Sequence, residues 1–293
     1  FSRNAPPRSE LAMRSSSGST GQPSVTYFDP VRECARRVQE LRMLSTLGAR
    51  PTDRQMVFDD VRNAPSSKHF VQKLGIWDRV YFPFERDPSE GLAEIEELQP
   101  EIINGVLTPL RMFAYHVRAE QDALSYRPKM VLSKGELLDK SNRRLIESVF
   151  GAPLYDYYAT EEVGIVAWQE PGQEFYNVDE DFVFVECIRP DGTPTEDGEP
   201  GELVLTNLYQ RAMPIIRFRT GDFGVLHRSP EGSRCGLPRL SRLRGRQIDF
   251  IVTPDGQIIA PFVLMVILEE TRKVLSFHIA QTAVDKVVVR FRL

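Results

Sequence analysis

Short apolar runs alternate with stretches of helical period from Val25 onward. The pair Asp29-Pro30 combines a helix-capping residue with a favoured first helical residue, which predicts a helix from there to Gly48. Apolar runs typical of buried strands follow at 56–58, 80–82, 102–103, 130–132 and 154–155, and helical stretches lie between them at 67–74, 89–98, 108–119 and 139–150. This alternation predicts right-handed βαβ crossovers and a mainly parallel sheet covered on both faces.

The pattern changes after Glu174 to strands separated by turn-rich segments. Strands are expected at 182–186 and 202–205, with turns at 189–194 and 196–201, which indicates an antiparallel subdomain. Beyond a boundary near 244–251, we expect a hairpin turn at Asp255-Gly256, a helix over 262–273, and strands over 277–280 and 286–291. Both ends of the sequence look cut, so we expect a piece of a longer protein.

The fold class expected is therefore α/β. A large N-terminal core over 1–244, incomplete at its start, would combine a mainly parallel sheet with an antiparallel β subdomain. A small, truncated α+β C-terminal domain would begin at 245 and run to 293.

Composition narrows the classes of function. The chain has 293 residues, 41% hydrophobic and 27% charged, with a formal net charge of -4. This charge provides no basic surface for nucleic acid, and no apolar run is long enough to cross a bilayer. Three widely separated cysteines, Cys34, Cys187 and Cys235, favour neither a disulfide framework nor a zinc site. We expect a cytoplasmic protein without nucleic-acid or membrane partners.

The segment from Ser15 to Pro23 reads Ser-Ser-Ser-Gly-Ser-Thr-Gly-Gln-Pro. Its hydroxyls can donate to phosphate oxygens, and its glycines let successive backbone N–H groups turn toward one anion. A flexible Ser/Gly linker is the alternative interpretation. It is not a Walker loop, because Gln22 follows Gly21 where that motif requires lysine.

Four later clusters stand where loops are expected to leave strands: 133–136 (Ser-Lys-Gly-Glu), 155–162 (Tyr-Asp-Tyr-Tyr-Ala-Thr-Glu-Glu), 213–222 (ending in Arg-Thr-Gly-Asp) and 244–249 (Arg-Gly-Arg-Gln-Ile-Asp). Aromatic faces of the second could stack on a purine, and its hydroxyl and carboxylate could hold phosphate-bound Mg²⁺. The carboxylate of the third could accept from a ribose diol, and a guanidinium of the fourth suits phosphate. Each also has an ordinary structural explanation: a strand-to-helix turn, a core strand followed by an acidic helix start, a hairpin at Gly221-Asp222, and solvated arginines.

Together and in this order, these clusters resemble the adenylate-forming superfamily of acyl-CoA synthetases and adenylation domains. Within it they are most similar to phenylacetate-CoA ligases, coenzyme F390 synthetases and CapK-type proteins. The matching elements run from the serine-rich loop at 15–23, through Tyr-Tyr-Ala-Thr-Glu and Arg-Phe-Arg-Thr-Gly-Asp, to the Gly-Arg pair before Asp249.

The resemblance implies a role for each matching position. The loop over the β- and γ-phosphates of ATP would consist of Ser16, Ser17, Gly18, Ser19, Thr20 and Gly21. At the nucleotide it places Asp156, Tyr157 and Tyr158, of which the two tyrosines would line the adenine. Catalytic roles fall to Thr160 at the α-phosphate, Glu161 as the Mg²⁺ ligand, and Arg246. Binding of the ribose diol falls to Asp222, and Glu136 would border the acyl and adenine region.

The resemblance also implies the reaction. A carboxylic acid, aryl or aryl-acetic by branch, would be activated with ATP and Mg²⁺ as an acyl-adenylate, and a thiol, typically that of CoA, would then displace AMP. Adenylyl transfer to a phenolic hydroxyl, or an inactive nucleotide-binding interaction module, are the alternatives. The adenylation lysine of the superfamily is not expected before Leu293, and large α/β ligases often form homodimers.

Overall fold

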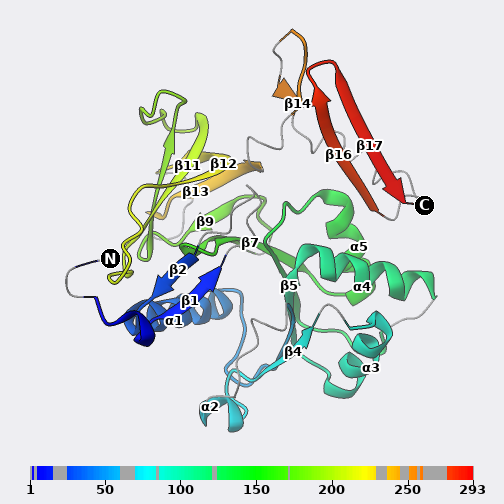
Figure 1. Ribbon diagram of the computed structural model, residues 1–293. Coiled ribbons are helices and arrows are strands. Elements are labelled where there is room, and N and C mark those ends of the chain that lie inside the picture. The colour runs from blue at the N-terminus through cyan, green and yellow to red at the C-terminus, as the bar shows by residue number, and fades with distance from the viewer. Residues whose placement is uncertain are drawn as a thin grey trace.

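The computed structural model describes residues 2, 5–15, 25–59, 70–83, 86–120, 124–170, 172–228, 236–244, 251–255, 258–259 and 276–292. They form an α/β fold around one eleven-stranded sheet with the strand order β10-β11-β12-β13-β9-β8-β7-β6-β5-β3-β4 (Figure 1). Strands β4, β3, β5, β6 and β7 pair in parallel. On the other side of β7, the strands follow in the order β8, β9, β13, β12, β11 and β10, and each pairs antiparallel with its neighbour. The α/β class and the mainly parallel core sheet are confirmed, and the antiparallel strands continue that same sheet.

Element bounds follow the sequence pattern closely in the parallel half. Its strands are β3 (Gln55–Asp59), β4 (Arg79–Pro83), β5 (Ile102–Val106), β6 (Met130–Lys134) and β7 (Leu154–Thr160), and the helices are α1 (Pro30–Thr46), α2 (Phe70–Lys73), α3 (Pro88–Leu98), α4 (Leu107–Ala119) and α5 (Lys140–Phe150). The antiparallel half holds β8 (Gly164–Gln169), β9 (Tyr176–Val178), β10 (Val183–Ile188), β11 (Pro200–Asn207), β12 (Phe218–His227) and β13 (Arg239–Arg244).

Smaller elements lie at the two ends of the chain. A short 3-10 helix, η1 (Arg8–Glu10), precedes the β1 (Ala12–Ser15) and β2 (Val25–Phe28) pair. Near the C-terminus, β14 (Ile251–Val252) pairs with β15 (Ile258–Ile259), and β16 (Ser276–Ala283) with β17 (Lys286–Arg292). The side chain of Gln281 donates to the Val252 carbonyl at 2.6 Å, which joins these two hairpins. The helix expected over 262–273 lies outside the described residues.

Two of the alternative structural explanations are wrong. Gly221-Asp222 is not a hairpin turn, because both residues lie inside the ten-residue strand β12, at an irregularity in its pairing. No helix starts after Thr160 either, because a turn leads directly into β8, which runs antiparallel to β7. Strand β7 is therefore the place where the sheet changes from parallel to antiparallel pairing.

The parallel half of the sheet is covered on both faces by helices. The helical period predicts that Val31 and Val38 face the core, and this is wrong, because they are 45% and 50% exposed. One face packs against α3, α4 and α5, which Figure 1 shows grouped together, through an aromatic cluster in which the Phe58 ring centroid lies 5.2 Å from that of Phe82 and 5.4 Å from that of Phe113. The other face packs against α1 through Met43 and Leu44, which are fully buried. Tight interior packing of this kind fixes the strand ends on which a site can be built.

The start of α1 is anchored by Asp29, as its capping residue type predicts. One carboxylate oxygen accepts from the Arg32 backbone N–H at 2.9 Å, which satisfies a free donor of the first helical turn. The other accepts from the backbone N–H groups of Arg211 and Ala212 at 3.0 and 2.8 Å. Burial alone would raise the pKa of Asp29, but these backbone hydrogen bonds outweigh it and hold the pKa below its ordinary value. Asp29 thus ties α1 to the loop after β11.

We expect Asp29→Ala to lower the free energy of unfolding by about 3 kcal/mol, because the variant loses a helix cap and leaves buried N–H groups unpaired. The matched control is Asp87→Ala, which removes the cap of α3, where the carboxylate accepts only from Ser89; about 1 kcal/mol is expected there. The pKa of folded Asp29 is lowered. Its stabilisation is therefore complete above about pH 4 and is lost as the pH falls through the lowered pKa. Chemical unfolding across pH measures both effects, and equal losses for the two variants would contradict the anchoring role.

Candidate functional site

The carboxyl ends of the parallel strands meet at one edge of the sheet, and two of the sequence clusters lie there. Ser133 and Lys134 end β6, Glu136 follows them, and Thr160 ends β7 next to Glu161. Ligands of open α/β sheets bind outside the carboxyl ends of the strands. The fold therefore brings the first and second of the four clusters, 133–136 and 155–162, to the edge where a ligand is expected.

A hydrogen bond joins two clusters that lie far apart in the chain. The hydroxyl of Tyr158 on β7 donates to the Asp222 carboxylate on β12 at 2.7 Å, across a separation of 64 residues. Both side chains are partly exposed. A bond from a phenol to a carboxylate is charge-assisted, and such bonds contribute about 1.5–3 kcal/mol. The aromatic segment and the Arg-Thr-Gly-Asp segment thus form one surface.

Backbone geometry around Asp222 positions its carboxylate. Gly221 has φ of +77°, which favours glycine, and it lets the strand depart from regular pairing. The backbone N–H of Asp222 donates to the Thr220 hydroxyl at 2.9 Å, and that hydroxyl donates to the Leu203 carbonyl at 2.9 Å. Thr220 is buried and missed by the sequence interpretation, although it stands within the same motif.

Thr160 ends β7 and Glu161 begins the turn that follows. Side chains from two other elements hold this turn in place. The Thr160 hydroxyl accepts from the Val163 N–H at 3.1 Å, and Glu161 is exposed. The carbonyl of Val163 accepts from the side chains of Asn207, at 2.9 Å, and of Arg32, which is 2% exposed. Neither Arg32 nor Asn207 carries a sequence signal for this role, since each lies far from the turn in the chain.

Other predicted residues take different environments. Glu136 is exposed and caps α4, accepting from the Thr108 hydroxyl at 2.6 Å and from its N–H at 3.3 Å. This fills a gap, because the N-cap residue of α4, Val106, makes no side-chain capping bond. The Tyr157 ring is 6% exposed among the core residues facing α1, and its hydroxyl donates to Asn104 at 3.3 Å. Burial raises the pKa of Tyr157.

Asp156 is directed into the interior. Its carboxylate is buried and accepts from the hydroxyls of Ser133 and, at 2.6 Å, Tyr176. Burial raises the pKa of Asp156 to about 6 despite these bonds. Alternation along a strand explains the placement, because Asp156 and Tyr157 point to opposite faces. The carboxylate is committed to protein donors, so nucleotide contact by Asp156 stays a prediction that this arrangement does not favour.

The remaining predicted positions cannot be placed. Residues Ser16 to Gly21 and Arg246 lie outside the described residues. Within the described part of the chain, His, Cys, Asp and Glu side chains form no group of three or more that could hold a metal ion. The helices in that part of the chain are also too short or too polar to cross a membrane.

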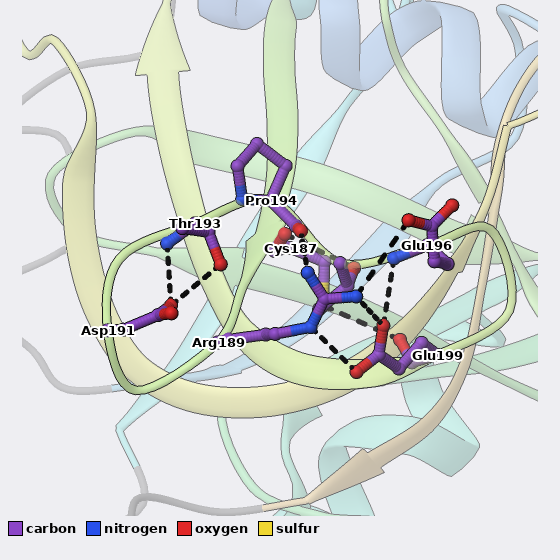
Figure 2. Close-up of polar contacts among 8 residues, drawn as sticks. Cys187, Arg189, Asp191, Thr193, Pro194, Glu196 and Glu199 are labelled. Carbon is purple, nitrogen blue, oxygen red and sulfur yellow. Dashed lines mark hydrogen bonds and ion pairs between the residues drawn. The ribbon is translucent and has the colours of Figure 1, made fainter.

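A second dense polar cluster, in the loop between β10 and β11, is a turn and not a site. Figure 2 shows the guanidinium of Arg189 paired with Glu199, with nitrogen–oxygen distances of 3.0 and 2.5 Å, and donating to the Pro194 carbonyl. Asp191 accepts from the N–H and hydroxyl of Thr193. The hydrogen bond from Arg189 lowers the pKa of Glu199. These groups close the loop upon itself.

We expect Gly164→Ala to destabilise the protein more than Gly172→Ala. Both glycines have positive φ, +90° and +75°, so both substitutions impose backbone strain. A methyl at Gly164 would also collide with the Arg32 guanidinium, whereas at Gly172 it would meet open space. Thermal or chemical unfolding should show about 1 kcal/mol for Gly172→Ala and about 3 kcal/mol or more for Gly164→Ala. Equal losses would show that Arg32 does not constrain the turn.

The chain is similar to known proteins in sequence and in fold. No protein-family model matches the chain. It is 27% identical over 256 residues to the phenylacetate-coenzyme A ligase of Escherichia coli K12, covering 83% of this chain and 56% of that protein. It is 24% identical over 201 residues to the protein CapK of Staphylococcus aureus, covering 68% of this chain and 43% of CapK. The chain thus spans about half the length of these relatives.

A solved structure shares the fold. The 2-hydroxyisobutyryl-CoA ligase in its postadenylation state, in complex with 2-HIB-AMP, matches 97% of this chain and 63% of that protein with a TM-score of 0.79 at 20% identity. This likeness extends over both the parallel and the antiparallel strands described above. Taken with the sequence relatives, it places the chain in the adenylate-forming superfamily.

Proposed function

We propose that this chain carries the nucleotide-binding core of an ATP-dependent ligase. The enzyme would activate an aryl or aryl-acetic acid as an acyl-adenylate and transfer the acyl group to a thiol such as CoA. The observation that carries the proposal is the 2.7 Å hydrogen bond between Tyr158 and Asp222, on the strand that ends at Thr160 next to the exposed Glu161. The relative from E. coli, a phenylacetate-coenzyme A ligase, supports the substrate class.

Each group would have a distinct part. A carboxylate accepts two hydrogen bonds, so Asp222, oriented by Tyr158 and Thr220, would bind the ribose diol. The Thr160 hydroxyl would donate to the α-phosphate. Attack of the substrate carboxylate oxygen on the α-phosphorus forms the mixed anhydride and releases pyrophosphate. No protein nucleophile is needed, so positioning and stabilisation of phosphate charge would provide the catalysis.

Glu161 would hold the Mg²⁺ that accompanies the nucleotide. A single exposed carboxylate fits this ion, because Mg²⁺ is usually bound by one or two carboxylates together with phosphate oxygens and water. When bound, it would neutralise phosphate charge. The serine-rich loop at 16–21 and Arg246 would act on the phosphates and ribose as the sequence resemblance implies. Residues from 245 onward would begin a small second domain.

Asp222→Ala should weaken AMP binding by about 10- to 100-fold, because a ligand diol loses its charged acceptor. The variant should not change the affinity for 2′,3′-dideoxy-AMP, which lacks the diol. Asp191→Ala is the matched control, since that exposed carboxylate accepts only within its own turn. Calorimetric titration measures the affinity of Asp222→Ala for AMP and for 2′,3′-dideoxy-AMP, and that of Asp191→Ala for AMP. Unchanged AMP affinity in Asp222→Ala would remove the ribose assignment.

Glu161→Gln should reduce acid-dependent exchange of labelled pyrophosphate into ATP by about 100-fold. The melting temperature should not change, because Glu161 is exposed. Glu174→Gln, at a side chain that is 92% exposed, is the control. Exchange by Glu161→Gln at the wild-type rate would exclude Glu161 as the metal ligand, and full-length wild-type protein that shows no exchange with any aryl acid would contradict the ligase.

A further inference from the structure

Four polar side chains gather on neighbouring strands at the carboxyl edge of the sheet: Asp59 on β3, Asn104 on β5, Lys134 on β6 and Tyr157 on β7. We call them the edge cluster. The Lys134 ammonium lies 2.8 Å from an Asp59 carboxylate oxygen, and the Tyr157 hydroxyl lies 3.3 Å from the Asn104 side-chain oxygen. Strand register places Lys134 opposite Tyr157.

The edge cluster lies on the face covered by α1. The preceding residues Phe58 and Ile103 belong to the core under α3–α5, so alternation turns Asp59 and Asn104 to the other face. Lys134 follows Ser133, which binds Asp156 on the α3–α5 side, and Tyr157 packs with α1 residues. All four side chains therefore occupy one layer between the sheet and α1.

Stability alone is a weak reason for this arrangement. The side chains of Asp59 and Lys134 are 9% and 28% exposed, and the loss of hydration of a buried ion pair largely offsets its attraction. Burial alone would lower the pKa of Lys134, but Tyr157, Asp59 and Glu40 outweigh it and raise that pKa. The ammonium therefore stays charged, and its bond to Asp59 uses one of three N–H donors.

The chemistry of the edge cluster suits a hydroxyl. Lys134 presents donors and Asp59 presents acceptors side by side, and a hydroxyl group is both donor and acceptor. An anionic substituent would meet the Asp59 carboxylate, and an apolar group would leave the polar atoms without a ligand partner. Tyr157 and Asn104 add a hydroxyl and an amide to the same layer between the sheet and α1.

The distance to the proposed reaction centre suits the acyl part of a substrate. Tyr157 precedes Thr160 by three residues on β7, which is about 10 Å at the rise of a strand. A carboxylate activated beside Thr160 would thus place the far side of a single aromatic ring near the edge cluster. Ligands at this edge of an α/β sheet are expected on general grounds.

We propose that the edge cluster binds a hydroxyl substituent of the acyl substrate, so that the preferred acid is a hydroxylated aryl or aryl-acetic acid. This rests on the proposed function, since it assigns the acyl end of the same site. Lys134 would donate to the hydroxyl oxygen, and Asp59 would accept its hydrogen.

The direct test compares non-hydrolysable acyl-adenylate analogues by calorimetry. The probes are the phenylacetyl, 3-hydroxyphenylacetyl and 4-hydroxyphenylacetyl sulfamoyl adenosines. At least one hydroxylated analogue should bind about 10- to 100-fold more tightly than the unsubstituted one, as expected for a hydrogen bond to a charged group. Binding of all three with equal affinity would overturn this inference and leave the proposed function intact. If neither the analogues nor AMP binds, the proposed function fails and this inference fails with it.

Variants locate the effect. Lys134→Met alone strands the buried Asp59 carboxylate and can unfold the protein, so the test uses Lys134→Met combined with Asp59→Asn, with folding checked by thermal melting. The affinity ratio between hydroxylated and unsubstituted analogues should fall to about one. Lys140→Met, at an 89% exposed lysine on α5, is the control and should keep the wild-type ratio. If the double variant keeps the affinity ratio of the wild-type protein, the inference is overturned. If the double variant does not fold, the comparison of the three analogues on wild-type protein decides.

Discussion

The connection between β7 and β8 depends on the buried guanidinium of Arg32. Arg32 reaches from α1 to the Val163 carbonyl, which also accepts from Asn207 on β11. Gly164 leaves the space that the guanidinium occupies. At this turn the sheet changes from parallel to antiparallel pairing. The geometry of the turn therefore determines how β12, which carries Asp222, lies relative to β7, which carries Tyr158. One fixed turn thus positions groups from three distant segments.

The parallel half of the fold could be predicted from the sequence because local signals agree there. Asp29-Pro30 starts α1, and Gly151 with φ of +62° ends α5, where capping chemistry and helical period indicate the same element. The antiparallel half could be predicted less well. Strand β9 has only three residues, and Gly221-Asp222 has the composition of a turn although tertiary pairing keeps it within β12.

The site could be predicted in its parts but not in its connections. Nothing in the sequence shows that the Tyr158 hydroxyl meets Asp222, because the bond depends on strand order across the sheet. The segment at 156–158 has uniform polar and aromatic composition, yet alternation turns Asp156 and Tyr157 to opposite faces, and Asp156 is buried while Tyr158, two residues further on, bonds to Asp222. The sequence also does not show that the Glu136 carboxylate caps α4, because Glu136 lies in a different segment, after β6. Residues that support a site from distant elements, such as Arg32 on α1 and Asn207 on β11, have no local pattern.

The central claim is that Tyr158, Thr160 and Asp222 surround one nucleotide. A crystal structure of the protein with bound AMP tests this most directly. The account predicts that both ribose hydroxyls lie within hydrogen-bond distance of the Asp222 carboxylate, that the Tyr158 bond is retained, and that the phosphate lies beside Thr160. A nucleotide bound away from Asp222, or with its ribose turned from this carboxylate, would contradict it.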